Sequence, residues 1–78
     1  MLVKGKITIY GTEGCSFCDA AKQLVESKGL EWEYVDASQD MSTFSKLFPT
    51  ARTVPQIMVG DVWLGGYSDL KEVLESVE

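Results

Sequence analysis

Residues 14–18 read Gly14-Cys15-Ser16-Phe17-Cys18, and they stand between a short apolar segment and an amphipathic one. The two cysteines are the only ones in the chain. A thiol attacks as its thiolate, and N–H groups at a helix start stabilise negative charge, so we expect a lowered pKa for Cys15. Cys18 follows one helical turn later, where it can attack a mixed disulfide on Cys15 and is more shielded. The spacing predicts a redox pair with Cys15 as nucleophile and Cys18 as resolving thiol.

Two other interpretations of the cysteine pair stay open at this level. A structural zinc site normally takes four nitrogen or sulfur ligands, and the chain has no histidine and no third cysteine. An inert disulfide would close a very short loop, which constrains the unfolded chain little, and disulfide-stapled small domains usually carry more cysteines. A Cys-x-x-Cys motif beside a strand–helix unit favours redox chemistry over both.

Length and composition limit the possible classes of protein. The 78 residues fit one domain, spanning residues 1–78. With 45% hydrophobic residues and two prolines, the chain is too apolar to be disordered and too interrupted to span a membrane. A net charge of −5 opposes binding to nucleic acid or to an anionic membrane. The first residues lack the apolar segment of a signal peptide, so we expect a cytoplasmic protein.

The segments around the cysteines alternate between strand and helix patterns. Residues 6–10 are rich in β-branched and aromatic side chains, which is typical of a buried strand. Residues 16–28 predict a helix, with Gly29 after its end. Residues 30–36 alternate apolar with acidic side chains and predict a strand with one solvated face. Together they predict a right-handed parallel crossover unit. The apolar positions at helical spacing are Phe17, Ala21, Leu24 and Val25.

A second, shorter helix is predicted after these three segments. Asp40 or Ser42 can cap its start, and Pro49 stops it. Its apolar side holds Met41, Phe44, Leu47 and Phe48. We expect Met41 and, further along the chain, Met58 to lie in the core.

The remaining residues predict a hairpin and a last helix. Residues 56–59 and 62–64 read as strands joined by a two-residue turn at Gly60-Asp61. The last helix is predicted from Ser68 to about Val77, with Asp69 and Glu72 at capping-box spacing. The resulting order, β-α-β-α-β-β-α, requires one mixed four-stranded sheet covered by three helices, an α/β fold. The aromatic side chains Trp32, Tyr34 and Trp63 are interpreted as sheet packing.

Three motifs together make the chain resemble a glutaredoxin over essentially its whole length. They are the Cys-x-x-Cys motif at a strand–helix junction, Thr53-Val54-Pro55, and Gly65-Gly66-Tyr67-Ser68-Asp69. The resemblance implies a thioredoxin-like fold and a monomer. It also implies reduction of protein disulfides and glutathione mixed disulfides, with glutathione as co-substrate. Ribonucleotide reductase is one partner protein that the resemblance suggests.

The same resemblance implies a glutathione-binding site. The Val54-Pro55 bond would be cis, leaving the backbone of Val54 to pair with an extended peptide. The start of the last helix would bind the γ-glutamyl carboxylate, and Asp69 its ammonium group. Alternatively, Pro55 merely starts a strand and Ser68 or Asp69 merely caps the helix. The implied site residues are Arg52, Thr53, Val54, Pro55, Gly66, Tyr67, Ser68 and Asp69.

Two residues depart from the pattern that many family members share. Thr12 stands where they carry Lys or Arg, which removes one cation near the nucleophile. Ser16 stands where the commoner motif has proline, so the backbone angle there is not fixed. Family members without that proline suggest an alternative function as a [2Fe–2S] cluster carrier, with Cys15 from two chains and two glutathiones as ligands. Another alternative is a glutaredoxin-like protein reduced by a flavoenzyme of the thioredoxin-reductase type.

Overall fold

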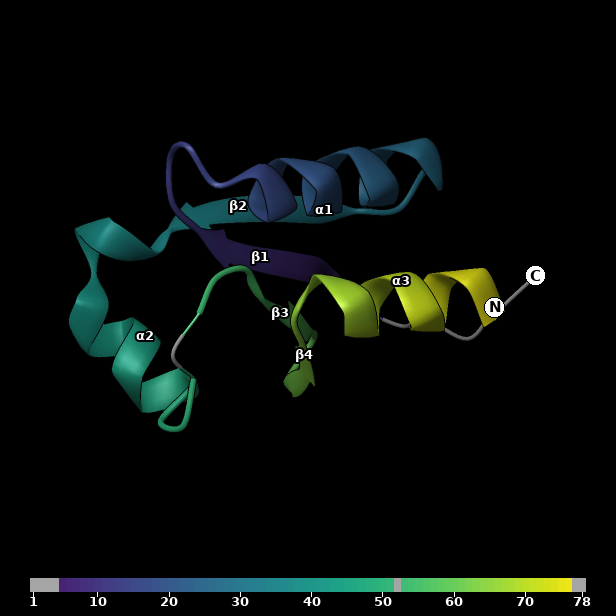
Figure 1. Ribbon diagram of the computed structural model, residues 1–78. Helices are drawn as coiled ribbons and strands as arrows, with labels where there is room; N and C mark the ends of the chain where they lie inside the picture. The colour runs from purple at the N-terminus through teal and green to yellow at the C-terminus, as the bar shows by residue number, and fades with distance from the viewer. Residues whose placement is uncertain (1–4, 52, 77–78) are drawn as a thin grey trace.

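The computed structural model describes residues 5–51 and 53–76, so the predictions for Arg52 and Val77 lie outside the described residues. Figure 1 shows the elements, which follow the predicted order. They are β1 (Ile7–Gly11), α1 (Ser16–Ser27), β2 (Trp32–Asp36), the 3-10 helix η1 (Ala37–Gln39), α2 (Met41–Leu47), β3 (Gln56–Val59), β4 (Val62–Gly65) and α3 (Tyr67–Ser76). The one element that the sequence did not predict is η1, whose start is capped by Asp36 Oδ1 accepting the Ser38 N–H at 2.9 Å.

The strands form the predicted four-stranded mixed sheet, in the order β2-β1-β3-β4. β1 pairs in parallel with β2 and antiparallel with β3, and β3 pairs antiparallel with β4. Gly60 has a φ of 58° in the turn between β3 and β4, a backbone conformation that glycine adopts without steric cost. The central strand β1 ends at Gly11, so it leads directly into the loop that carries the cysteines.

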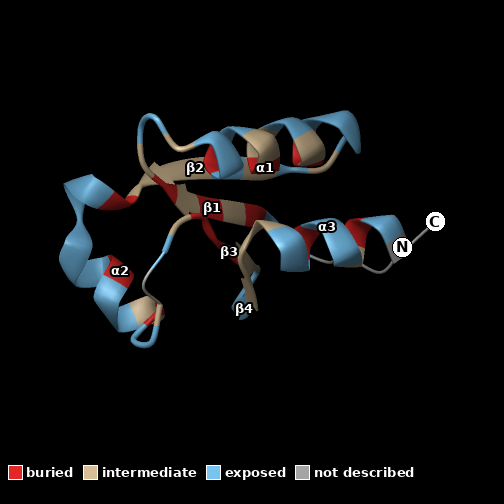
Figure 2. Ribbon diagram, viewed as in Figure 1, coloured by how far each residue is buried: buried red, intermediate tan, exposed pale blue. Residues whose placement is uncertain are grey.

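Helices α1 and α3 pack side by side on one face of the sheet. Burial of apolar side chains between these two layers is the main stabilising term of such a core. Figure 2 shows the buried residues gathered along β1 and β3 and on the inner sides of the two helices. The buried cluster consists of Ile7, Ile9, Ala21, Val25, Ile57, Leu70 and Leu74.

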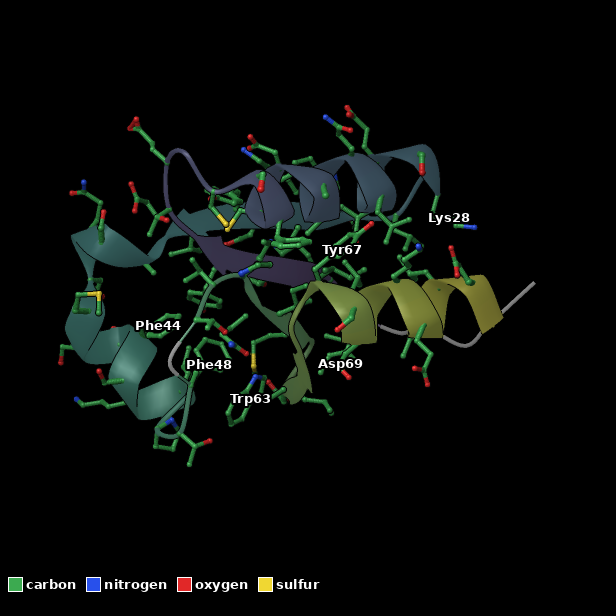
Figure 3. The ribbon with its side chains drawn as sticks, viewed as in Figure 1. Lys28, Phe44, Phe48, Trp63, Tyr67 and Asp69 are labelled. Atoms are coloured by element: carbon green, nitrogen blue, oxygen red, sulfur yellow. The ribbon has the colours of Figure 1, made fainter. Side chains whose placement is uncertain are left out.

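The opposite face of the sheet is covered by η1, α2 and the residues after it. Tyr10 and Met58, which alternate with the buried isoleucines along β1 and β3, pack against a second cluster of Ala37, Phe44 and Phe48. Figure 3 shows Phe44, Phe48 and Trp63 near one another. The ring of Phe48 meets the rings of Tyr10, Phe44 and Trp63 edge-on, with centroids 5.1 to 5.2 Å away. The interpretation of Trp63 as a packing residue is therefore confirmed.

Two residues predicted for the core are exposed. Phe17 has 61% of its surface exposed and Met41 has 56%, although both fall on the apolar stripe of a helix. Each lies in the first turn of its helix. Helical spacing identifies a side of the helix, but it does not say how far along that side the sheet extends.

The helix starts also differ in detail from the sequence predictions. Asp40, rather than Ser42, caps α2, because its Oδ1 accepts the Thr43 N–H at 3.1 Å. Helix α3 begins at Tyr67, so neither Ser68 nor Asp69 is its N-cap. Asp69 instead reaches back, and its Oδ2 accepts the N–H of Gly66 at 3.2 Å. The predicted capping box of Asp69 with Glu72 is wrong, because Asp69 is itself the third residue of the helix and supplies the reciprocal bond.

Within the part of the chain that the structure describes, every helix is too short or too polar to cross a membrane.

Candidate active site

Cys15 is the N-cap residue of α1, and its sulfur takes the capping role that serine or aspartate usually has. The Cys15 Sγ accepts the backbone N–H of Cys18 at 3.1 Å. The loop from β1 reaches this position through Gly14, whose φ is 74°. Cys15 is partly exposed, so its sulfur can meet a substrate while a backbone donor points at it. The predicted position of Cys15 at a helix start is confirmed.

Cys18 lies in the first turn of the same helix and is completely buried. The pKa of the Cys18 thiol is raised to about 11, first by burial, because a thiolate is poorly solvated there, and second by the hydrogen bond to Cys15. Hydrogen bonds from the backbone of Thr12 and the hydroxyl of Tyr34 act on the same pKa in the opposite direction. Cys18 is therefore protonated at neutral pH. Its complete burial confirms the predicted shielding from solvent, and its role as resolving thiol stays a prediction.

The Val54-Pro55 segment lies directly against the nucleophile. Its peptide bond is cis, as the family resemblance implied. The thiol of Cys15 points at the carbonyl oxygen of Val54, with 3.8 Å between sulfur and oxygen. Val54 precedes β3 and stands outside the pairing of that strand with β1. Its backbone can therefore bind a ligand without disturbing the sheet.

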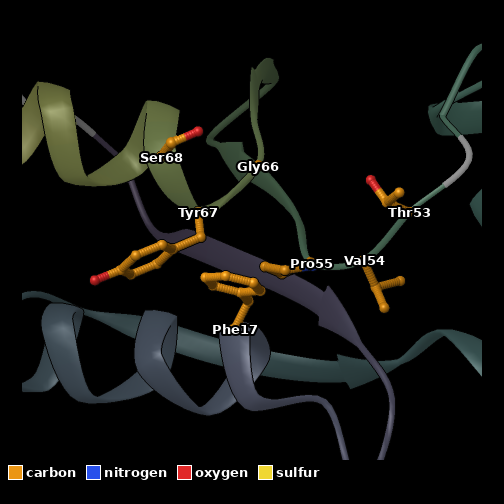
Figure 4. Close-up of a pocket in the computed structure, with 7 residues that line it drawn as sticks. All are labelled: Phe17, Thr53, Val54, Pro55, Gly66, Tyr67 and Ser68. Atoms are coloured by element: carbon orange, nitrogen blue, oxygen red, sulfur yellow. The ribbon is translucent and has the colours of Figure 1, made fainter.

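A cavity of about 400 Å³ opens beside Val54 and Pro55. It is lined by Phe17, Thr53, Val54, Pro55, Gly66, Tyr67 and Ser68 (Figure 4). The rings of Phe17 and Tyr67, from the starts of α1 and α3, face each other with centroids 5.8 Å apart. The structure thus brings six residues predicted for the glutathione site around one cavity.

Phe17 was missed as a candidate site residue because its helical spacing matched the core stripe. The signal that could have identified it is its position between the two cysteines. A residue there lies in the exposed first turn, beside whatever molecule Cys15 attacks. Its 61% exposed surface in the structure fits this position.

Asp69 lies next to this cavity but does not line it. A side chain at Gly65, whose φ is 129°, would collide with the Asp69 carboxylate, so this glycine allows the carboxylate to reach Gly66. A carboxylate has about four acceptor sites, so the bond to Gly66 leaves capacity for a ligand ammonium group. Arg52, the other charged residue of the predicted site, lies outside the described residues.

A second cavity of about 270 Å³ lies on the other side of the Thr53-Val54 segment, which borders both cavities. Its remaining lining residues are Thr12, Ala37, Met41, Phe44 and Ala51. The exposed Met41 is thus a wall of this hollow rather than a core residue. Thr12, the residue that stands where many relatives have a cation, also borders this cavity.

Tyr34 reaches the cysteines, which its interpretation as a packing residue did not anticipate. Its hydroxyl donates to the backbone carbonyl of Thr12 at 3.1 Å and hydrogen-bonds the Cys18 sulfur.

Residues 5–51 and 53–76 contain no group of three or more His, Cys, Asp or Glu side chains that could hold a metal ion. A cluster shared between two chains draws one cysteine from each, so that alternative stays a prediction.

Comparisons with known proteins agree with this arrangement. A family model described as Glutaredoxin matches residues 7–64. The chain is 33% identical over 66 residues to a glutaredoxin of Pseudomonas aeruginosa, covering 82% of this chain and 79% of that protein. It is 38% identical over 71 residues to the hybrid peroxiredoxin hyPrx5 of Haemophilus influenzae, covering 90% of this chain, and spans 30% of that longer protein. The solution structure of a glutaredoxin from Brucella melitensis has a TM-score of 0.78 and 31% identity, covering 96% of this chain and 84% of that one. The mixed sheet with its three helices is the thioredoxin-like fold, and the chain belongs to the glutaredoxin family.

Proposed function

We propose that this protein is a glutathione-dependent thiol–disulfide oxidoreductase that reduces protein disulfides and glutathione mixed disulfides. Membership of the glutaredoxin family supports thiol oxidoreductase chemistry in general. The observation that carries the glutathione dependence is the contact of the Cys15 sulfur with Val54, a residue that lines the 400 Å³ cavity. A peptide held in that cavity would have its own sulfur next to the nucleophile.

The first step is an attack by the Cys15 thiolate on one sulfur of the substrate disulfide. A new bond forms between Cys15 and that sulfur, and the second sulfur leaves as a thiolate that takes up a proton. When the substrate is a glutathionylated protein, Cys15 takes over the glutathione and the protein thiol is released. The thiolate of a second glutathione then attacks the bound one, which yields oxidised glutathione and regenerates Cys15.

The second route uses Cys18 when the substrate is a disulfide within a protein. Cys18 attacks the Cys15 sulfur, the bond from Cys15 to the substrate breaks, and the reduced substrate leaves. Two glutathione molecules then reduce the Cys15–Cys18 disulfide, one through a mixed disulfide and the second by displacing the first. The first route consumes one free glutathione, because the substrate supplies the other, and the second route consumes two; each route yields one oxidised glutathione.

Glutathione is an extended peptide with a carboxylate at each end and a free ammonium group. The backbone of Val54 can pair with its central part, as an added strand would. The first N–H groups of α3, from Tyr67 and Ser68, lie at the positive end of that helix and suit the γ-glutamyl carboxylate. Asp69 would bind the ammonium group, and Arg52 is proposed for the glycyl carboxylate.

The reductant is tested by two coupled assays on the same substrate, the mixed disulfide of glutathione with a cysteine-containing peptide. We expect NADPH to be consumed when glutathione and glutathione reductase are supplied. A flavoenzyme of the thioredoxin-reductase type, supplied alone, should give no turnover. Turnover with that flavoenzyme and none with glutathione would overturn the proposal in favour of a glutaredoxin-like protein with a different reductant.

Substitution of Asp69 tests the proposed ammonium contact. A hydrogen bond to a charged group contributes about 1.5–3 kcal/mol, so Asp69→Ala should raise the KM for the glutathionylated peptide by roughly tenfold or more. The same change removes the acceptor for the Gly66 N–H, and loss of a helix cap costs about 1 kcal/mol.

Asp69→Asn is the matched control, because its amide oxygen can still accept from Gly66 while the negative charge is gone. We expect a raised KM for both variants and a lowered melting temperature for the alanine variant only. If KM stays at the wild-type value in both, Asp69 serves the helix and does not bind the ammonium group.

A further inference from the structure

The hydroxyl of Tyr34 and the sulfur of Cys18 share one small space at the end of β1. A Cβ atom built on Gly11 would lie 2.5 Å from the Cys18 Sγ and 2.5 Å from the Tyr34 Oη. Glycine at this position therefore leaves the room in which the two atoms meet. A hydrogen bond joins the phenol to the thiol, so Tyr34 touches the atom that must attack the mixed disulfide on Cys15.

The hydrogen bonds in this space differ between the two protonation states of Cys18. Tyr34 has one hydrogen, which it donates to the Thr12 carbonyl at 3.1 Å. A neutral Cys18 thiol can then donate its own hydrogen to the phenol oxygen. Once Cys18 is ionised, it can only accept, and the phenol hydrogen can turn from Thr12 to the sulfur. The backbone N–H of Thr12 is the second donor to this sulfur.

The surroundings keep Tyr34 protonated and in place. Burial raises the pKa of its phenol far above the ordinary value, and the neighbouring Cys18, Cys15 and Asp19 raise this pKa further, so it stays a donor. On the α1 side, the Lys22 Nζ lies 4.2 Å from the centre of the Tyr34 ring and 3.3 Å from the Asp19 carboxylate. This cation–π contact holds the ring against α1.

We propose that Tyr34 controls the reactivity of the resolving thiol by donating a hydrogen bond to the Cys18 sulfur as it attacks Cys15. In this step the Cys18 sulfur bonds to the Cys15 sulfur, the Cys15–substrate bond breaks, and the proton from Cys18 ends on the departing thiolate. No further oxidant or reductant is needed. The inference rests on the proposed role of Cys18 in the dithiol route.

The test measures the resolving step itself. Reduced protein is mixed rapidly with excess oxidised glutathione, quenched with acid at intervals, and analysed by mass for the mixed disulfide and the Cys15–Cys18 disulfide. Rates are collected for wild type and Tyr34→Phe from pH 7 to above 11. Tyr10→Phe is the matched control, because Tyr10 loses the same hydroxyl from a neighbouring strand but packs against Phe48, away from the thiols.

We expect Tyr34→Phe to slow the resolving step about threefold to tenfold at neutral pH. Loss of a hydrogen bond to an anion should raise the pKa of Cys18 by about one to two units, and the thiolate fraction falls tenfold per unit. The greater nucleophilicity of a more basic thiolate recovers about threefold per unit. Above the wild-type pKa of Cys18 the wild-type thiolate fraction levels off while that of the variant still grows, so the gap between the two rates should narrow as the pH rises through 11. Tyr10→Phe should follow wild type throughout.

A second variant carries 3,5-difluorotyrosine at position 34, whose fluorines make the phenol a stronger donor without removing it. It should accelerate the step and keeps the proposal testable if Tyr34→Phe is unfolded. If both variants fold and the rate of the resolving step is unchanged in each, Tyr34 does not control Cys18. If Tyr34→Phe slows the step by the same factor at every pH, the cause is altered packing, and the proposal is again overturned. If wild type forms no Cys15–Cys18 disulfide at all, the dithiol route fails and the role of Tyr34 fails with it.

Discussion

Substituting serine for Cys15 is expected to remove all turnover, with glutathionylated peptides and with disulfide-bonded proteins alike. Both routes begin with a bond from the Cys15 sulfur to the substrate, and a serine hydroxyl cannot form a mixed disulfide. The measurement is NADPH consumption coupled through glutathione and glutathione reductase. The loss should leave no rate above that of the uncatalysed exchange with glutathione.

Cys15→Ser should keep its fold, so the lost activity can be assigned to chemistry. Serine is a favoured N-cap residue, and its oxygen can accept the Cys18 N–H that the sulfur accepts now. A melting temperature close to that of wild type is therefore the control. If Cys15→Ser is both inactive and unfolded, Cys15→Ala is the variant to compare, and it also lacks the atom that accepts the Cys18 N–H.

Cys18→Ser separates the two routes. Glutathione itself releases the bound glutathione from Cys15, so removal of glutathione from a peptide should continue at a comparable rate. Reduction of a disulfide within a protein should fall strongly, because the intermediate on Cys15 then has no neighbouring thiol to displace the substrate. Equal losses of both activities would contradict the assigned roles of the two cysteines.

The strongly patterned segments of this sequence predicted the fold well. Residues 30–36 alternate apolar with polar side chains, which only a strand can bury on one face, and they form β2. Residues 16–28 carry apolar side chains at helical spacing, and they form α1. Boundaries shifted by one or two residues where capping decided them. Asp40 competes with Ser42 for the start of α2, and Gly66 takes the N-cap position that Ser68 or Asp69 was expected to fill. Local pattern identifies the element, while hydrogen bonds formed at its end fix the first residue.

The candidate site was predictable where its residues sit in motifs and unpredictable where contacts depend on strand pairing. Cys15, Val54 and Tyr67 lie in motifs whose order along the chain already implies a shared site. Tyr34 is different, because it reaches Cys18 only through the register of β2 against β1, in which Tyr34 stands opposite Ile9. A shift by one residue would turn the phenol to the other face of the sheet. Sequence periodicity alone does not fix this register.

Gly11 also emerges from the structure, as the residue whose lack of a side chain lets Cys18 and Tyr34 meet. We expect Gly11→Ala to lower the free energy of unfolding by about 1–3 kcal/mol, the usual cost of forcing a methyl group into a packed interior. The added Cβ would lie 2.5 Å from the Cys18 Sγ and 3.0 Å from the Cys18 Cβ, distances at which atoms must move. For a domain of this size each kcal/mol lowers the melting temperature by about 4–8 °C.

A partner substitution tests whether the cost arises from this contact. Cys18→Ala removes the sulfur, which is one of the two atoms that would lie 2.5 Å from the new methyl group, so Gly11→Ala/Cys18→Ala should be more stable than the sum of the single changes implies. Thermal melting of wild type, the two single variants and the double variant gives the coupling between the two sites.

Gly11→Ala should also slow formation of the Cys15–Cys18 disulfide, because the Cys18 sulfur can no longer occupy the space between Thr12 and Tyr34. A melting temperature equal to that of wild type, or strict additivity in the double variant, would contradict a close fit of Gly11 against the resolving thiol. A favourable coupling together with slow disulfide formation would tie the end of the central strand to the geometry of the redox pair.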